Sequence, residues 1–229
     1  MNKLLLKLST FAVASVTFMV TFALPLGVQA QEIKGDAAVG KTKNAMCIGC
    51  HGIPGYQASF PEVYKVPKIS GQGAKYIVSS LNAYKKGERK HPTMRGIAES
   101  LSDQDMADLA AYYSMHGVVE GATLAAKPSK EPSPQVAALL QKAACISCHG
   151  ENFAKPISPD YPKIAGQYTD YLYVSLKAYK TENNPNIGRS NGVMAGMVKQ
   201  FSNNELKEIS KYVGSLPGDL KTVPQTSFR

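Results

Sequence analysis

The sequence Cys47-Ile-Gly-Cys-His51 recurs later in the chain as Cys145-Ile-Ser-Cys-His149. Residues at positions i, i+3 and i+4 of a helix share one face, so each copy brings two thiols and an imidazole together. Two sulfurs for thioether bonds and one nitrogen for iron are what covalent attachment of a c-type haem requires. The doubled motif therefore predicts two covalently bound haem c groups. The predicted thioether residues are Cys47, Cys50, Cys145 and Cys148.

Three other uses of these four cysteines fit the pattern less well. A disulfide within Cys-x-x-Cys would close a strained, tight loop. A redox-active Cys-x-x-Cys pair does not need a histidine beside it in both copies, and no strand pattern surrounds either motif. Structural zinc would need four converging ligands, whereas each motif offers fewer. Covalent haem is the interpretation that uses every residue of both motifs.

The two motifs lie within a longer internal repeat. The segment Pro67-Lys-Ile-Ser-Gly-Gln72 returns as Pro162-Lys-Ile-Ala-Gly-Gln167, and further matches follow in the same order. Ordered matches with slightly drifting spacing indicate a duplicated domain with insertions in its loops. We expect the following boundaries: a signal peptide at 1–30, domains at 31–122 and 133–220, a proline-containing linker at 123–132, and a tail at 221–229.

Each predicted domain reads as helical, so the expected fold class is all-α. Ser133-Pro134 is an N-cap followed by proline at the first helical position, and predicts one helix that runs to His149. Ser102 and Ser202 each precede an acidic residue at capping-box spacing and then apolar residues at helical period. Middle helices are expected over 74–86 and 169–180. Three main helices per domain, joined by long loops, is the predicted architecture.

The sixth ligand of each iron decides between an electron carrier and an enzyme. Met94 and Met194 occupy equivalent places just before the two capped helices. A thioether opposite histidine raises the reduction potential and closes the iron to substrates. Met197 is an alternative to Met194, but its counterpart in the first half is Ile97. We therefore predict His51, Met94, His149 and Met194 as the axial ligands.

Two smaller expectations concern the surroundings of these ligands. A ligating histidine usually donates its second ring N–H to a fixed acceptor, and the carbonyls of Pro67 and Pro162 are candidates for that acceptor. His91 lies three residues before Met94, but the second half has no histidine at the matching position. We expect His91 to be a surface residue.

Composition and the N-terminus bound the location of the protein. Residues 1–30 have a short positive start, an apolar stretch and a Val28-Gln29-Ala30 cleavage pattern, which predicts a signal peptide and a periplasmic protein. An uncleaved membrane anchor is the alternative. The formal net charge of +9 could steer the protein to acidic redox partners or to peripheral association with an anionic membrane. Nucleic acid is not an expected partner, because no basic helix or aromatic-basic platform is present.

Taken together, these motifs resemble a known family. Each unit is similar to a class I cytochrome c, with Cys-x-x-Cys-His near its start, a Pro-Lys-Ile-x-Gly segment and a methionine before the last helix. Two tandem units resemble the cytochrome c4 family, and the Gly-Gln after Pro-Lys-Ile and the run from Leu101 to Tyr113 are closest to it. The resemblance implies two haem domains that carry electrons between periplasmic or membrane respiratory complexes, toward a terminal oxidase.

Two alternative functions remain at this point. Tandem class I units also resemble the haem subunit of a dehydrogenase, such as a sulfide-oxidising flavocytochrome, and the electron chemistry would then be the same with a different partner. A two-haem enzyme, such as a peroxidase or a thiosulfate-converting enzyme, would need an open or differently ligated iron. The matched pair Met94 and Met194 argues against an enzyme, so we expect an electron-transfer protein.

Overall fold

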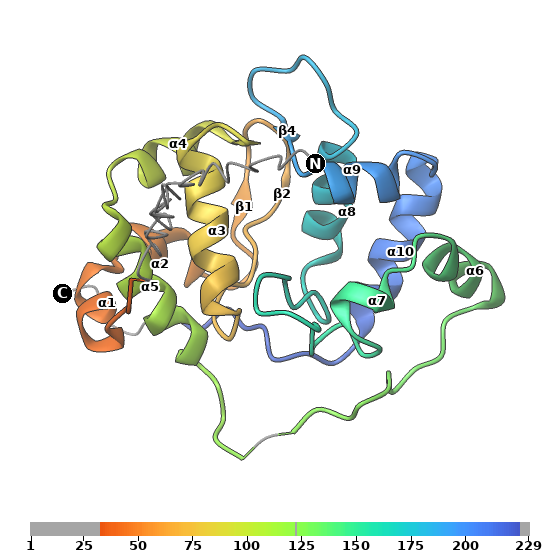
Figure 1. Cartoon of the computed structure of the whole chain (residues 1–229), viewed down its shortest axis with the longest axis horizontal. Helices are drawn as coiled ribbons and strands as arrows, with labels where there is room; N and C mark the ends of the chain where they lie inside the picture. The colour runs from red at the N-terminus through yellow and green to blue at the C-terminus, as the bar shows by residue number, and fades with distance from the viewer. Residues whose placement is uncertain (1–32, 122, 225–229) are drawn as a thin grey trace, which may run out of the picture. The chain divides into compact units, whose positions relative to one another are not determined.

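The structure is a computed structural model that describes residues 33–121 and 123–224. The expected signal peptide at 1–30 therefore lies outside the described residues. The described chain is mostly helical, with four strands of two residues each (Figure 1). The helices are α1 (Ala37–Lys43), α2 (Ala45–His51), α3 (Ala74–Lys85), α4 (Pro92–Glu99), α5 (Asp103–Met115), α6 (Pro134–Lys142), α7 (Ile146–His149), α8 (Thr169–Ala178), α9 (Gly192–Val198) and α10 (Asn203–Ser215). Within 33–121 and 123–224, no helix has the length and apolar character needed to cross a membrane.

The apolar core forms two clusters, one in each half of the chain. In the first half, α5 contacts α1 and α3, and its residues Met106, Leu109 and Tyr113 are buried. In the second half, α10 contacts α8 and α6, with Leu206 of α10 and Phe153 buried between them. Burial of apolar surface around the last helix of each half is thus what assembles each unit.

The predicted capping boxes are confirmed at both final helices. The Ser102 side chain accepts from the backbone N–H of Asp105, whose carboxylate in turn accepts from the Ser102 N–H. Ser202 and Glu205 form the same reciprocal pair at the start of α10. Each box satisfies N–H groups that the first helical turn leaves without an intrahelical partner. The predicted middle helices are also present, as α3 and α8.

The single helix predicted from Pro134 to His149 is wrong, because the chain breaks it into α6 and α7. Ala144 has a φ of 46°, in the left-handed region, and the N–H of Cys145 donates to the carbonyl of Leu140 at 3.1 Å. This bond across five residues closes the helix end in the manner of a Schellman motif, which needs a left-handed residue. Because of this break, most of the second attachment motif lies on a separate short helix, α7, and not on a continuation of α6.

Two short helices, α4 and α9, were not predicted, and they carry Met94 and Met194. Sequence periodicity did not indicate them because helices of seven or eight residues give too few repeats of an apolar pattern. Each begins at a capping side chain, His91 for α4 and Asn191 for α9. Met94 and Met194, which stand before the two capped final helices as predicted, thus lie in the first turn of short capped helices of their own.

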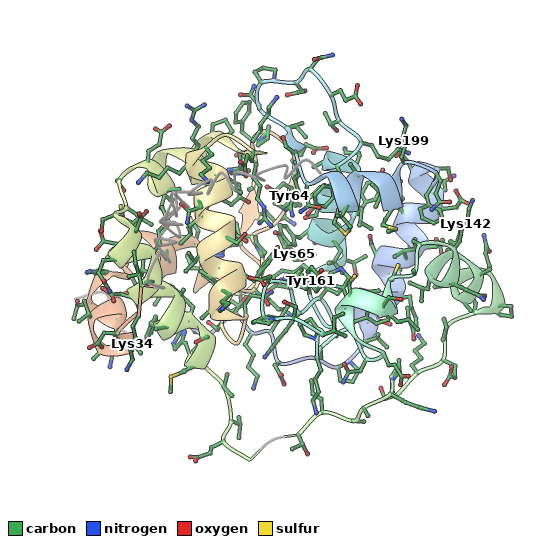
Figure 2. All side chains as sticks on the ribbon, in the orientation of Figure 1. Lys34, Tyr64, Lys65, Lys142, Tyr161 and Lys199 are labelled. Carbon is green, nitrogen blue, oxygen red and sulfur yellow. The ribbon has the colours of Figure 1, made fainter. Side chains whose placement is uncertain are left out.

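The two halves contact each other through short strands as well as side chains. Strand β1 (Gln57–Ala58) pairs with β2 (Tyr64–Lys65) within the first half, and β3 (Arg89–Lys90) pairs antiparallel with β4 (Gly188–Arg189) of the second. Figure 2 labels Tyr64 and Lys65 on β2, which contacts α8. The backbone N–H of Lys65 donates to the carboxylate of Asp170 in α8 at 2.9 Å. After α10 the chain returns to the first half, where the N–H of Lys221 donates to the carbonyl of Ser70.

Candidate haem sites

The first attachment motif lies on α2, as the spacing predicts. Cys47, Cys50 and His51 occupy the last turns of this helix, and both cysteines are partly buried and free of disulfide bonds. Burial raises the pKa of Cys47 to about 11, so its thiol is neutral in the folded chain. The helix thus presents two thiols and an imidazole from one continuous element.

A cavity of about 310 Å³ opens beside this motif, and both halves of the chain line it. Met94 contributes to its wall together with Cys47, Cys50 and His51. Tyr113 also lines the cavity, and its buried hydroxyl has no hydrogen-bond partner within the described chain. Burial raises the pKa of Tyr113, so the hydroxyl remains a donor. The wall also has an apolar part, which includes Leu81, Ile97, Leu109, Ile164 and Leu172, and a polar part, which includes Gln72, Arg89 and Gln167.

The second motif is divided between a helix end and a short helix. Cys145 immediately precedes α7, and Cys148 and His149 lie within it. Both cysteines are partly buried and free, and Cys145 packs against the second apolar cluster. Burial raises the pKa of Cys145 to about 11, as it does for Cys47. His149 is only 9% exposed, so the second imidazole is held inside the protein.

Both motif histidines have their orientation fixed by a proline carbonyl, as the sequence predicts. The Nδ1 of His51 lies 2.8 Å from the carbonyl oxygen of Pro67, and that of His149 lies 3.1 Å from the carbonyl oxygen of Pro162. A carbonyl can only accept, so Nδ1 is the protonated nitrogen in each ring. Burial lowers the pKa of both histidines, although the proline bonds oppose this. Each imidazole is therefore neutral, with the lone pair of Nε2 available to a metal.

The two predicted methionines have matching backbone environments. The N–H of Met94 donates to Nδ1 of His91 at 3.3 Å, and the N–H of Met194 donates to Oδ1 of Asn191 at 3.0 Å. His91 is thus a partly buried N-cap, and the expectation of a surface residue was wrong. The signal that was missed is that His91 and Asn191 stand three residues before equivalent methionines, which is capping distance.

The side chains distinguish Met194 from its neighbour Met197. Met194 is partly buried and packs against the second apolar cluster, whereas Met197 is 39% exposed. Met194 thus packs against the same apolar cluster as Cys145 of the second motif. This arrangement favours Met194 over Met197 as a ligand.

Comparison with known proteins agrees with this geometry. The model of the family described as Cytochrome c matches the chain twice, at residues 37–114 and 135–217. A relative from Azotobacter vinelandii described as cytochrome c4 is 31% identical over 213 residues, a match that covers 86% of this chain and 98% of the relative. The chain belongs to the cytochrome c4 family. It is therefore a two-haem electron-transfer protein with two covalently bound haem c groups and two tandem cytochrome c domains.

Further matches include a solved structure and a relative whose description states a redox partner. The crystal structure of reduced recombinant cytochrome c4 from Pseudomonas stutzeri is 26% identical, with a TM-score of 0.58, over 80% of this chain and 100% of that chain. A protein of Stutzerimonas stutzeri (strain A1501) described as a thiosulfate dehydrogenase electron acceptor is 27% identical, over 85% of this chain and 91% of its own. The chain is thus similar both to cytochromes c4 and to an electron acceptor of a dehydrogenase.

Two partly buried arginines, one in each half, could pair with the anionic groups of haem. Arg89 donates to the hydroxyl of Tyr76 at 2.9 Å, and Arg189 donates to Tyr171 and Ser175 at 3.1 and 2.9 Å. Among the described residues, neither guanidinium forms an ion pair with a carboxylate. Burial opposes ionisation of Tyr76, but the two guanidiniums lower its pKa below the ordinary value. A partly buried guanidinium is stabilised by an anionic partner, and the propionate carboxylates of haem would be suitable partners.

Proposed function

We propose that His51 with Met94, and His149 with Met194, are the axial pairs of the two haem irons. Cys47 and Cys50 would hold the first haem, and Cys145 and Cys148 the second, within domains at 31–122 and 133–220. A bound haem supplies a one-electron centre that alternates between ferric and ferrous iron. The observation that carries the proposal is that each half combines a neutral histidine fixed through Nδ1 with a methionine on a capped helix.

The residues around each iron would keep the coordination closed. The Pro67 and Pro162 carbonyls hold each imidazole in the tautomer that binds metal through Nε2. His91 and Asn191 fix the first turn of the helices that bring the thioethers. With a histidine and a methionine holding each iron, the haem would exchange electrons and would offer no open position to a substrate.

A spectroscopic experiment tests the axial pairs. In the purified ferric holoprotein, the methionine–iron charge-transfer band reports the thioether bond, and two haems give two contributions. Met194→Ala should remove the contribution of the second haem, whereas the matched control Met197→Ala should keep it. Loss of the band in Met197→Ala with retention in Met194→Ala would reverse the ligand assignment.

The proposed role is transfer of electrons between respiratory complexes in the periplasm, toward a terminal oxidase. The family supports this role, and residues 1–30 would direct export as a signal peptide. The net charge of +9 supports association with acidic surfaces on partner complexes or with an anionic membrane. Reduction of the holoprotein by a quinol-oxidising complex, and its reoxidation by a terminal oxidase, are the reactions to measure.

A second candidate function is supported by the relative described as a thiosulfate dehydrogenase electron acceptor. In this case the protein would accept electrons from a periplasmic dehydrogenase instead of a quinol-oxidising complex. The test measures the rate at which the same holoprotein is reduced by a quinol-oxidising complex and by a thiosulfate dehydrogenase supplied with thiosulfate. A faster reaction with the dehydrogenase, together with its co-purification, would favour the second candidate.

A further inference from the structure

Two buried glutamines cross between the halves of the molecule in a reciprocal arrangement. Gln72 belongs to the first half and Gln167 to the second, and they are 5% and 4% exposed. The side chain of Gln72 accepts from the N–H of Lys163 at 2.9 Å and donates to the carbonyl of the same residue at 3.0 Å. The side chain of Gln167 accepts from the N–H of Lys68 at 3.0 Å and donates to its carbonyl at 2.9 Å. Each glutamine thus pairs with the backbone of one lysine in the opposite half.

The backbone groups that these glutamines bind also touch the predicted haem ligands. The N–H of Lys68 and the carbonyl of Pro67 belong to one peptide group, and that carbonyl accepts from Nδ1 of His51. A continuous chain of hydrogen bonds therefore runs from His51 through one peptide group to Gln167. The equivalent chain runs from His149, through the peptide group of residues 162 and 163, to Gln72.

Each glutamine Oε1 also accepts a hydrogen bond from the backbone of the next residue in its own half. The Oε1 of Gln72 accepts from the N–H of Gly73 at 3.0 Å, and that of Gln167 accepts from the N–H of Tyr168 at 3.0 Å. Each acceptor oxygen is therefore held by one N–H from its own half and one from the other half. Because these acceptors are buried, their hydrogen bonds act in a low local dielectric, where they are electrostatically stronger than in water.

We infer that each glutamine tunes the reduction potential of the haem in the opposite half through this shared peptide group. An acceptor on the peptide N–H polarises the group and makes its carbonyl a stronger acceptor. A stronger bond from Nδ1–H makes the imidazole a more electron-rich ligand, which favours ferric iron. Gln167 thus lowers the potential of the first haem, and Gln72 that of the second. The inference rests on the proposed histidine ligands.

Each glutamine is expected to act on the haem of the opposite half, and this distinguishes tuning of the potential from a purely structural role in joining the halves. Glutamine could simply join the two units, as Lys68 does where its Nζ donates to the carbonyl of Gly166 at 2.6 Å. Loosening the contact would affect both haems in a similar way. Polarisation of one peptide group affects one histidine, and that histidine lies in the half without the substitution.

The test compares Gln167→Leu with Gln72→Leu in the two-haem holoprotein. Leucine removes both the Oε1 acceptor and the Nε2 donor, keeps similar bulk and adds no charge; of these two groups only Oε1 bonds the peptide group that the histidine shares. In Gln167→Leu the first haem should favour the ferrous state by about three- to tenfold more than in the parent, and the second haem should move less than half as much. Gln72→Leu should give the mirror image. In the reduced proteins, NMR should show an upfield shift of Nδ1–H for His51 in Gln167→Leu, and for His149 in Gln72→Leu.

Two further variants keep the inference falsifiable. Lys68→Met removes a side-chain contact between the halves but leaves the peptide N–H, so the His51 Nδ1–H signal should stay in place. If leucine prevents folding, Gln167→Glu provides a charged acceptor and should move that signal downfield. Equal shifts of both haems in each leucine variant, or shifts confined to the substituted half, would overturn the inference. A parent protein without the methionine–iron band would instead count against the proposed axial pairs.

Discussion

The cap of α9 provides a quantitative test of how the fold holds an axial ligand. In Asn191→Ala, the N–H of Met194 loses the oxygen that it now meets at 3.0 Å. Loss of an N-cap side chain costs about 1 kcal/mol of helix stability. Because α9 has only seven residues, it has few other internal bonds to compensate. A cost of about 1 kcal/mol corresponds to about a fivefold change in an equilibrium constant.

The perturbed equilibrium is the one between methionine-bound and methionine-free iron at the second haem. Added imidazole binds only the methionine-free form, so its apparent affinity rises in proportion to the population of that form. We expect Asn191→Ala to bind imidazole about fivefold more tightly at the second haem. The measurement is a spectrophotometric titration of the ferric holoprotein that follows loss of the methionine–iron band.

The design contains two internal controls. Asn191→Asp retains an acceptor at the N-cap and should titrate like the parent protein. The first haem, whose helix is capped by His91, should keep its own imidazole affinity in both variants. An unchanged affinity at the second haem of Asn191→Ala, or the same increase in Asn191→Asp, would refute the idea that this cap holds the ligand.

Three further predictions follow from single positions. Ala144 is exposed and has a φ of 46°, so Ala144→Gly should relieve about 1–2 kcal/mol of left-handed backbone strain. The greater freedom of glycine in the unfolded chain offsets about 0.4–1 kcal/mol of that gain, so a modest rise in melting temperature is expected and a lower one would contradict this. Burial lowers the pKa of His91. Its contribution to stability is therefore complete above the unfolded pKa of about 6.5 and is lost as the pH falls through the folded value. Protonated Nδ1 of His91 can no longer accept from the N–H of Met94, so the methionine–iron band of the first haem should weaken in acid. His91→Asn should remove this acid dependence, and an unchanged pH profile of the band would count against it. The hydrogen bond from Lys43 lowers the pKa of Asp108, so this carboxylate stabilises the fold above about pH 4 and less as the pH falls further. Asp108→Asn should lower the melting temperature at pH 7 and reduce the difference between pH 7 and pH 3; equal melting curves would exclude this role.

Local sequence determined the cofactor, the repeat and the start of the last helix in each half. Cys47, Cys50 and His51 are close along one helix, so their chemistry depends only on helical geometry. The capping boxes at Ser102 and Ser202 likewise involve residues three apart, and the chain forms them wherever the helix lies. The proline acceptors were also predictable, because a ligating histidine needs a partner for its second nitrogen.

Other features of the sites depend on contacts between distant parts of the chain. The bond from Lys68 to Gln167 joins residues 99 positions apart, and no periodicity within one segment indicates it. Arg89 and Arg189 are brought together by the pairing of β3 and β4, whose two-residue strands are too short to recognise by alternation. The break at Ala144 places a non-glycine residue at positive φ, contrary to local preference.

The sequence by itself therefore determined that two haems are attached and which residues are the candidates to bind them. It did so because attachment depends on residues within one helical turn, where spacing alone decides which side chains meet. Only the tertiary structure decided how the halves face each other and which peptide groups connect one half to the ligands of the other. Those contacts join separate elements whose positions depend on how each half buries its own apolar cluster.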